Sequence, residues 1–313
     1  MKIVCIGSFN RDMVYGVDHI AVGGETILSH SLSTYWGGKG LNQAVALARS
    51  FDGVYMAGLV NRREEAVCDF LRENNVHSDY VAFSEKPTGH AIICVDKNGQ
   101  NSITVFGGAN QALTPAYVRE TLANFEAGDI VLVQNETNQL ETILREAHAR
   151  GLRVAMNPSP FQKELLALPL ELVDYFLINE IEGCQLTGEA QPEKIIAAAG
   201  KKFPAALVLT LGKAGAMYAA GGAVLQHGTY DVPVVDTTAA GDSFVASFST
   251  LWCAGLPARQ ALAFASHAAA ITVSRPGAIP SLPTLAEVTA LLRERGYEDM
   301  DYDLLAQLEE ESK

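Results

Sequence analysis

Short apolar runs recur along the chain and are separated by stretches with helical periodicity. The runs at residues 3–7, 130–134, 154–157, 175–179 and 207–211 are rich in β-branched residues. Such runs are typical of parallel strands that are buried on both faces. They predict the core of a sheet.

The intervening stretches repeat apolar residues at helical spacing. Leu140, Ile143 and Ala147 predict one helix, and Gly151 follows them where a C′ glycine is expected. Residues 244–252 show the same spacing. Strands that alternate with helices predict an α/β fold with a doubly wound, mostly parallel sheet flanked by helices.

Two segments break this alternation. Residues from about 11 to 36 and from about 90 to 108 show strand patterns with no helix between them, and Asp96-Lys97-Asn98-Gly99 predicts a hairpin turn. We expect them to form a small β-sheet beside the main one, with a lid as its natural role. The interpretation is therefore one domain, residues 1–313, that carries a β lid.

Composition narrows the class of partner. Lys and Arg number 23 against 36 Asp and Glu, which gives a net charge of −13. Such a surface repels nucleic acid and anionic membranes, so a small-molecule ligand is expected. The five cysteines are far apart and form no C-x-x-C, which indicates reduced thiols. With no apolar run of membrane-spanning length, a soluble cytoplasmic protein is expected.

Polar residues follow several predicted strands. They are Q-N-E at 134–136, N-P at 157–158, N-E-I-E at 179–182 and T-L-G at 210–212. Ligands of open parallel sheets bind at the carboxyl ends of strands. Loops are polar in any case, but four such ends together favour a site.

Two glycine-rich or acidic stretches near the N-terminus are candidates for that site. G-G-K-G-L-N at 37–42 is not a Walker A loop, because Gly40 and not Ser or Thr follows Lys39. Its glycines allow close approach to a ligand, with Lys39 and Asn42 as hydroxyl partners, although a structural helix entry is the alternative. Asn10 and Asp12 follow the first strand; Asp12 suits a sugar diol, or it belongs to a turn.

Two further stretches suit phosphate. T-L-G-K-A-G at 210–215 permits an anion-cradling turn or a simple hairpin. In D-T-T-A-A-G-D-S-F, the small residues Ala239, Ala240 and Gly241 leave N–H groups open at a helix N-terminus. Asp242 is then placed to accept a proton from a hydroxyl, a step worth about 10²–10⁴-fold, or it merely caps the helix.

These motifs, in this order, resemble the ribokinase family of sugar kinases, also called the phosphofructokinase-B family. The likeness spans nearly the whole chain and includes D-T-x-x-A-G-D-x-F, G-G-K-G-x-N, N-P-S-P, N-x-x-E and H-A-A-A-I-T-V-S-R-P-G-A. It implies an α/β domain with a β lid, often a homodimer through the lids. It also implies transfer of the ATP γ-phosphoryl group to a sugar hydroxyl.

The resemblance assigns roles residue by residue. Asp242 would be the catalytic base and Ala239, Ala240 and Gly241 the anion hole. ATP and Mg²⁺ would be bound by Asn179, Glu182, Thr210, Gly212, Gly215, Gly241 and Ser266. A K⁺ ion would be bound, mostly by backbone oxygens, at Asp236, Thr238, Thr272, Arg275, Gly277 and Ser281.

The implied sugar contacts resemble those of ribose-specific members. They are Asn10, Asp12, Gly38, Lys39, Asn42, Glu136 and Asp242. D-ribose is thus the expected substrate, with another sugar, a sugar acid or a nucleoside such as pseudouridine as alternatives. A non-catalytic sensor is disfavoured by the intact Gly241–Asp242 pair. Two departures from the pattern, Arg11 and G-L-V-N-R-R at 58–63, are expected on or near the sugar side, where they argue against ribose.

Overall fold

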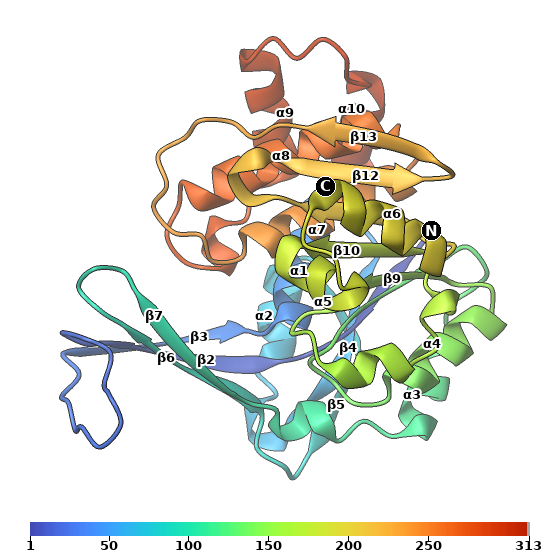
Figure 1. Cartoon of the computed structure of the whole chain (residues 1–313). Helices are drawn as coiled ribbons and strands as arrows, with labels where there is room; N and C mark the ends of the chain where they lie inside the picture. Colours follow the sequence, from blue (N-terminus) through green and yellow to red (C-terminus); the bar gives the residue numbers. More distant parts are fainter. Residues whose placement is uncertain (312–313) are drawn as a thin grey trace.

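The computed structural model describes residues 1–311 and contains two sheets, of which the larger has nine strands (Figure 1). Their spatial order is β13 (Ala223–His227), β12 (Ala216–Ala220), β11 (Ala206–Thr210), β10 (Tyr175–Asn179), β9 (Arg153–Asn157), β8 (Ile130–Gln134), β1 (Ile3–Ile6), β4 (Val54–Asn61) and β5 (His77–Ser84). All neighbours from β11 to β5 pair in parallel, and β12 and β13 pair antiparallel at one edge. The predicted mostly parallel sheet is confirmed.

The strand order reverses at β1, which lies between β4 and β8. The chain first builds outward through β4 and β5 and then continues on the other side of β1 from β8 onward. Ligands of doubly wound sheets bind outside the carboxyl ends of the strands at such a reversal. The topology alone therefore places a site near the residues that follow β1 and β8.

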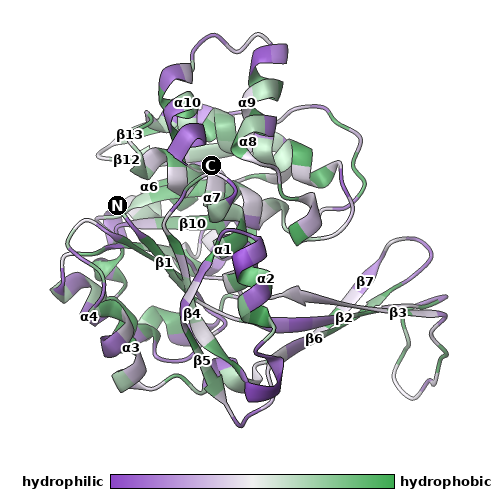
Figure 2. Cartoon of the chain, turned by 180° about the vertical axis from the view of Figure 1, so that it is seen from behind, coloured by the Kyte–Doolittle hydropathy of each residue, from purple (hydrophilic) through white to green (hydrophobic). Residues whose placement is uncertain are grey.

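Helices cover both faces of this sheet. One face is covered by α1 (Lys39–Ala48), α2 (Val67–Glu73), α7 (Ala240–Cys253), α8 (Ala258–Val273), α9 (Leu285–Glu294) and α10 (Tyr302–Glu311). The other is covered by α3 (Pro115–Leu122), α4 (Leu140–Ala149), α5 (Glu180–Thr187) and α6 (Pro192–Lys202). In β1, Ile3 and Cys5 pack on the first face, while Val4 and Ile6 pack on the second. Burial on both faces explains the continuous apolar runs, and Figure 2 shows hydrophobic colours along the central strands.

Short 3₁₀ turns complete the connections. They are η1 (Arg62–Glu64), η2 (Gly108–Gln111), η3 (Lys163–Ala167), η4 (Leu170–Leu172), η5 (Gly212–Ala214) and η6 (Ile279–Ser281). Within residues 1–311, the structure has no helix that is both long and apolar enough to cross a bilayer.

The smaller sheet consists of the two segments that broke the α/β rhythm. Its order is β3 (Ser31–Gly37), β2 (Asn10–Gly16), β6 (Gly89–Val95) and β7 (Asn101–Phe106). β6 and β7 form the predicted hairpin, where the Asp96 carboxylate accepts hydrogen bonds from the N–H groups of Asn98 at 2.8 Å and Gln100 at 3.0 Å. The sheet projects from the main body (Figure 1). Because β2 begins at Asn10, shortly after β1 ends, the projecting sheet starts beside the strand-order reversal.

Candidate active site

Asp242 lies in the first turn of α7, and its side chain crosses to α1. Its Oδ1 accepts a hydrogen bond from Gln43 Nε2 at 2.8 Å, and its Oδ2 accepts one from Asn42 Nδ2 at 3.3 Å. Asp242 is 8% exposed. Ala239, not Asp242, occupies the N-cap position. The capping alternative is therefore wrong, because the carboxylate bonds to another helix and not to its own first turn.

The backbone before Asp242 opens the helix end. Ala239 has φ 60°, a left-handed conformation that costs a non-glycine residue about 1–3 kcal/mol and persists mainly at functional sites. The N–H groups of Gly241 and Asp242 have no acceptor inside the helix, as in any first turn. A Cβ placed on Gly241 would meet no atom within 4 Å. This end of α7 thus has outward donors, a favourable dipole and free space for an anion.

Asn10 and Asp12 lie in β2 and not in a turn, so the turn alternative is wrong. Alternation in a strand places both side chains on one face. Asn10 is buried, and its Oδ1 accepts a hydrogen bond from Asn110 Nδ2 at 2.9 Å. A Cβ on Gly37 would lie 1.9 Å from Asp12 Oδ2, so a larger residue there would displace the Asp12 carboxylate. Burial, and secondly the charge of Glu136, raise the pKa of Asp12 to about 6.

Glu136, which follows β8, connects β1 with the start of α1. Its Oε2 accepts hydrogen bonds from the Ser8 hydroxyl and from the Lys39 N–H, the latter at 2.9 Å. The charge of Asp242 raises the pKa of Lys39 against the opposing effect of burial, and Glu136 and Glu182 add to this. The Lys39 ammonium therefore lies in the field of three carboxylates.

The glycine-rich stretch also has a packing role. A Cβ on Gly40 would lie 2.3 Å from the backbone N of Ser8, so α1 can begin this close to β1 only with glycine. Nearby, Asn42 Oδ1 is buried and has no hydrogen-bond partner among the described residues. An unpaired buried acceptor is costly, and the hydroxyl of a ligand would satisfy it.

A cavity of about 640 Å³ adjoins the N-terminus of α7, where Ala240 and Gly241 line it. It is lined by the predicted ATP residues Thr210, Gly212, Gly215, Gly241 and Ser266. Apolar side chains, among them Val232, Val234, Phe244 and Val273, also line it. Ser266 Oγ is buried and has no partner in residues 1–311. The size and the apolar lining with few polar groups suit an aromatic base.

The T-L-G-K-A-G stretch forms the hairpin that one of its two interpretations predicts, and the anion-cradling role stays a prediction. β11 and β12 form an antiparallel hairpin around η5, and four residues of the stretch line the cavity described above. Gly215 has φ 100°, and a Cβ there would lie 2.0 Å from His227 O. The turn is therefore both a hairpin and a cavity wall.

Asn179 and Glu182 cap α5 reciprocally. Asn179 Oδ1 accepts the Glu182 N–H at 2.9 Å, and Glu182 Oε2 accepts the Asn179 N–H at 3.0 Å. This capping box holds the buried Glu182 in place and leaves its Oε1 outside the box. The motif thus has a structural role as a helix cap, and its Mg²⁺ role stays a prediction.

The predicted K⁺ residues converge on two neighbouring loops. Asp236 accepts hydrogen bonds from Thr238 N–H at 2.9 Å, Thr238 Oγ1 at 2.6 Å and Gly277 N–H at 2.9 Å. The remaining three residues, Thr272, Arg275 and Ser281, lie at the end of α8 and in the segment that follows. Thr272 Oγ1 donates a hydrogen bond to Ala268 O, and Arg275 forms an ion pair with Glu287. Asp236 thereby ties the segment before α7 to the segment after α8.

Comparison with known proteins identifies the family. Residues 1–285 match the family described as pfkB family carbohydrate kinase. The chain belongs to this family. It is 36% identical over 300 residues to a ribokinase of Bacillus subtilis, covering 93% of this chain and 100% of that protein.

Two solved structures of ribokinases have the same fold. One from Thermotoga maritima matches with a TM-score of 0.82 and 30% identity, covering 94% of this chain and 99% of that one. One from Arabidopsis thaliana, described as complexed with ribose and ATP, matches with a TM-score of 0.80 and 31% identity over 93% and 98% of the chains. The resemblance based on motifs is confirmed, and the chain is a kinase that transfers phosphate from ATP to a sugar hydroxyl.

Within this pfkB kinase, the sequence reasoning missed the polar residues that support Asp242. Gln43 bonds to it directly, and Gln43 Nε2 also donates to Asn157 Oδ1 at 3.1 Å. Gln134 donates to Gln43 Oε1 at 2.7 Å. Gln134 and Asn157 were recognised only as polar strand ends, and Gln43 had no signal beyond its place after Asn42.

The two departures from the family pattern make contacts outside the group of predicted sugar residues. Arg11 alternates with Asn10 and Asp12, so its side chain lies on the opposite face of β2. There its guanidinium lies 3.7 Å from the centroid of the Trp36 ring, and its Nε is 2.8 Å from Glu64 Oε1. Arg11 thus points away from Asn10 and Asp12, and its position relative to a bound sugar stays a prediction.

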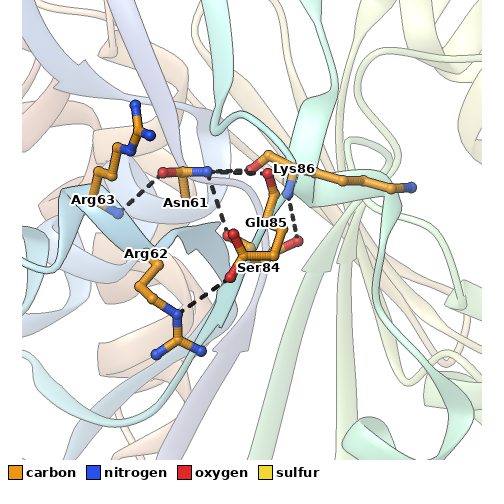
Figure 3. A network of polar contacts seen from close by, with 6 residues as sticks. All are labelled: Asn61, Arg62, Arg63, Ser84, Glu85 and Lys86. Atoms are coloured by element: carbon orange, nitrogen blue, oxygen red, sulfur yellow. Dashed lines mark hydrogen bonds and ion pairs between the residues drawn. The ribbon is translucent and has the colours of Figure 1, made fainter.

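The N-R-R stretch stabilises a surface turn (Figure 3). Asn61 Nδ2 lies 3.4, 3.3 and 2.9 Å from the carbonyl oxygens of Ser84, Glu85 and Lys86, which connect β5 to β6. Asn61 Oδ1 accepts the Arg63 N–H at 3.0 Å, and Arg62 lies 3.4 Å from Glu85 at an exposed position. The side chains of Asn61 and Arg62 thus order the connection to the projecting sheet, and their position relative to a bound sugar stays a prediction.

Proposed function

We propose that the protein phosphorylates D-ribose at its 5-hydroxyl, using ATP, to give ribose 5-phosphate. The observation that carries this proposal is the grouping of Asn42 and Lys39 around the buried Asp242, with Asp12 beside Glu136, which accepts a hydrogen bond from the Lys39 N–H. Asp12 and Asn42 offer acceptors for sugar hydroxyls. The relatives named ribokinase, which match over nearly their whole length, support it. The two departures argue less against ribose, because Arg11 packs on Trp36 and Asn61 bonds to the connection between β5 and β6.

Each group in the site then has a task. Asp242 accepts the proton of the attacking hydroxyl, and the open N–H groups at the start of α7 stabilise charge on the transferring phosphoryl group. Lys39 adds positive charge beside that position. Phosphoryl transfer depends mainly on positioning and charge, and in-line placement of the reactants is worth about 7–11 kcal/mol.

We propose that Mg²⁺ and K⁺ assist. Asn179 and Glu182 would hold Mg²⁺ mostly through water, because one carboxylate oxygen of Glu182 stays outside the capping box, and carboxylates are preferred ligands. Mg²⁺ supplies charge neutralisation to the phosphates. Backbone oxygens of the two loops joined by Asp236 fit K⁺, which favours carbonyl ligands, and would fix the anion hole beside them.

We also propose that the smaller sheet, residues of about 11–36 and 90–108, is a lid within a single domain that comprises residues 1–313. It begins beside Asp12 and would exclude water, which competes with the sugar as acceptor. Exposed apolar side chains on it, Leu32, Tyr35, Ile103 and Val105, favour a homodimer through the lids. The five free thiols favour a cytoplasmic location.

A sister kinase for another sugar, a sugar acid or a nucleoside is the second candidate, because the same base and anion hole would serve any of these acceptors. A non-catalytic sensor would have no use for an open Gly241 beside a buried Asp242. The nature of the acceptor is therefore the feature to measure.

The test is ATP turnover against a panel of pentoses, hexoses, sugar acids and nucleosides, with and without K⁺. We expect ribose to give the highest kcat/KM, and K⁺ to raise it. If ribose is inactive while another compound turns over, the ribose proposal fails and the kinase assignment stands. If the rate is the same with K⁺ as with a large organic cation, the K⁺ proposal fails.

A further inference from the structure

Four polar side chains form a continuous buried chain that ends on Asp242. Gln134 Nε2 donates to Gln43 Oε1 at 2.7 Å, and Gln43 Nε2 donates both to Asp242 Oδ1 at 2.8 Å and to Asn157 Oδ1 at 3.1 Å. Asn157 Nδ2 donates to the backbone carbonyl of Leu177 at 2.8 Å. The chain joins the ends of β8 and β9 to α1 and α7 and is anchored on β10.

The anchor fixes the direction of every bond in this chain. A backbone carbonyl only accepts, so Asn157 must point its NH₂ group at Leu177 and its oxygen at Gln43. Gln43 must then point its NH₂ group at Asn157 and Asp242, which leaves its oxygen for Gln134. If the Gln43 amide were flipped, its oxygen would face both Asn157 Oδ1 and the Asp242 carboxylate, and neither could donate a hydrogen bond to it. The N–H donor to Asp242 is thus built into the fold.

The two oxygens of Asp242 are consequently not equivalent. Oδ1 accepts a short bond from Gln43, which is 0% exposed, whereas the one contact of Oδ2 within residues 1–311 is that with Asn42 at 3.3 Å. Asn42 is among the predicted sugar contacts, and its own Oδ1 is unpartnered. Oδ2 therefore lies on the side where a sugar hydroxyl would bind.

We propose that Gln43 is a positioning residue that occupies Oδ1 of Asp242 and so assigns proton acceptance to Oδ2. This inference rests on the proposed role of Asp242 as the base. In the step, the sugar O–H bond breaks and its proton moves to Oδ2, while the oxygen forms a bond to the γ-phosphorus of ATP. The bond from that phosphorus to the β–γ bridging oxygen breaks, and ADP leaves with the electron pair. Gln43 itself touches no substrate, because it is fully buried.

The test is a double-mutant cycle of Gln43→Met and Asp242→Asn, with kcat and both KM values measured. Methionine keeps the length of the side chain and removes the donor. In the wild-type background we expect Gln43→Met to lower kcat about 10²-fold, the cost typical of a misplaced reacting group, with KM values changed less than about threefold. In the Asp242→Asn background it should change the residual rate less than about twofold, since no base remains to be positioned.

Two further variants serve as matched comparisons. Gln134→Met removes a glutamine one bond further away and leaves both Gln43 N–H bonds in place, so it should cost less than about tenfold in kcat. Gln185→Met, at an exposed position on α5, should leave kcat unchanged. A wild-type kcat for a folded Gln43→Met protein, or the same fall in both backgrounds, would overturn the positioning role. Wild-type turnover in Asp242→Asn alone would instead remove the base, and with it the proposed function.

If Gln43→Met does not fold, Gln43→Glu keeps the test open because it has the same shape. A neutral Glu can donate to Asp242, whereas an ionised one repels it. We expect the kcat of Gln43→Glu to fall as pH rises across a range where the wild-type kcat does not. Parallel pH profiles of the two proteins would contradict the inference.

Discussion

Asp12→Asn should make the free protein more stable at pH 8 while it weakens sugar binding. In the structure, the Asp12 carboxylate is partly buried beside Glu136, and no hydrogen bond to it is seen within residues 1–311. Burial and the neighbouring charge raise its pKa from 3.8 to about 6. The charged form is therefore destabilised by folding.

The size and sign of the effect follow from linkage. Because the folded pKa is the higher one, this group stabilises the fold fully below pH 3.8, and that contribution is lost as pH rises through about 6. The shift of about two pKa units corresponds to up to about 3 kcal/mol. Asparagine does not titrate, so the substitution has one part of its effect that is the same at every pH. After this part is subtracted, the free energy of unfolding of Asp12→Asn should match that of the wild type near pH 4 and exceed it near pH 8.

The assay is urea unfolding of both proteins at pH 4 and pH 8 without ligands. Asp18→Asn, which changes an exposed carboxylate in the loop after β2, is the control and should not alter the pH dependence. Equal pH dependence in Asp12→Asn and the wild type would refute the reasoning. The same variant should raise the ribose KM about 10–100-fold, since hydrogen bonds to a charged acceptor are worth about 1.5–3 kcal/mol.

Three further predictions follow from the structure. Gly241→Ala should leave the free energy of unfolding within about 0.5 kcal/mol, because the added Cβ meets no protein atom, but should lower kcat at least about tenfold by filling the anion site; unchanged turnover would contradict that site. Arg11→Met should cost about 1 kcal/mol of stability through its contacts with Trp36 and Glu64, and a ribose KM raised more than tenfold would contradict its placement away from the sugar. Removal of Mg²⁺ by a chelator should abolish turnover while thermal unfolding of the free protein stays unchanged, and a lowered Tm would indicate a structural metal instead.

The main sheet could be predicted closely from the sequence, because strands that are buried on both faces consist of continuous apolar runs. Each predicted strand of the main sheet lies within one residue of the observed one, and Gly151 has φ 72° just after α4, as its predicted stop role requires. The second sheet was predictable for a different reason. Its hairpin turn is stabilised by residues close together in the chain, because the Asp96 side chain accepts hydrogen bonds from the N–H groups of Asn98 and Gln100.

The site was only partly predictable because its decisive contacts are distant in the chain. Asp242 and Gln43 are 199 positions apart, so no local pattern pairs them. The interpretation of Asp242 as a cap failed for that reason, since its carboxylate bonds to α1. The interpretation of Asp12 as a turn residue failed because Asp12 lies within β2. The face of Arg11, by contrast, follows from strand alternation with Asn10 and Asp12, a signal that was present in the sequence.

A crystal structure of the Asp242→Asn variant with ribose, Mg²⁺ and ATP would show the unreacted substrates together and so reveal whether position 242 contacts the attacking hydroxyl. The account predicts that the ribose 5-hydroxyl lies about 2.6–3.2 Å from the side chain at position 242, on the Oδ2 side. It also predicts the γ-phosphate against the N–H of Gly241, in line with that hydroxyl. A side chain at position 242 turned toward solvent, or a sugar bound away from it, would contradict the account.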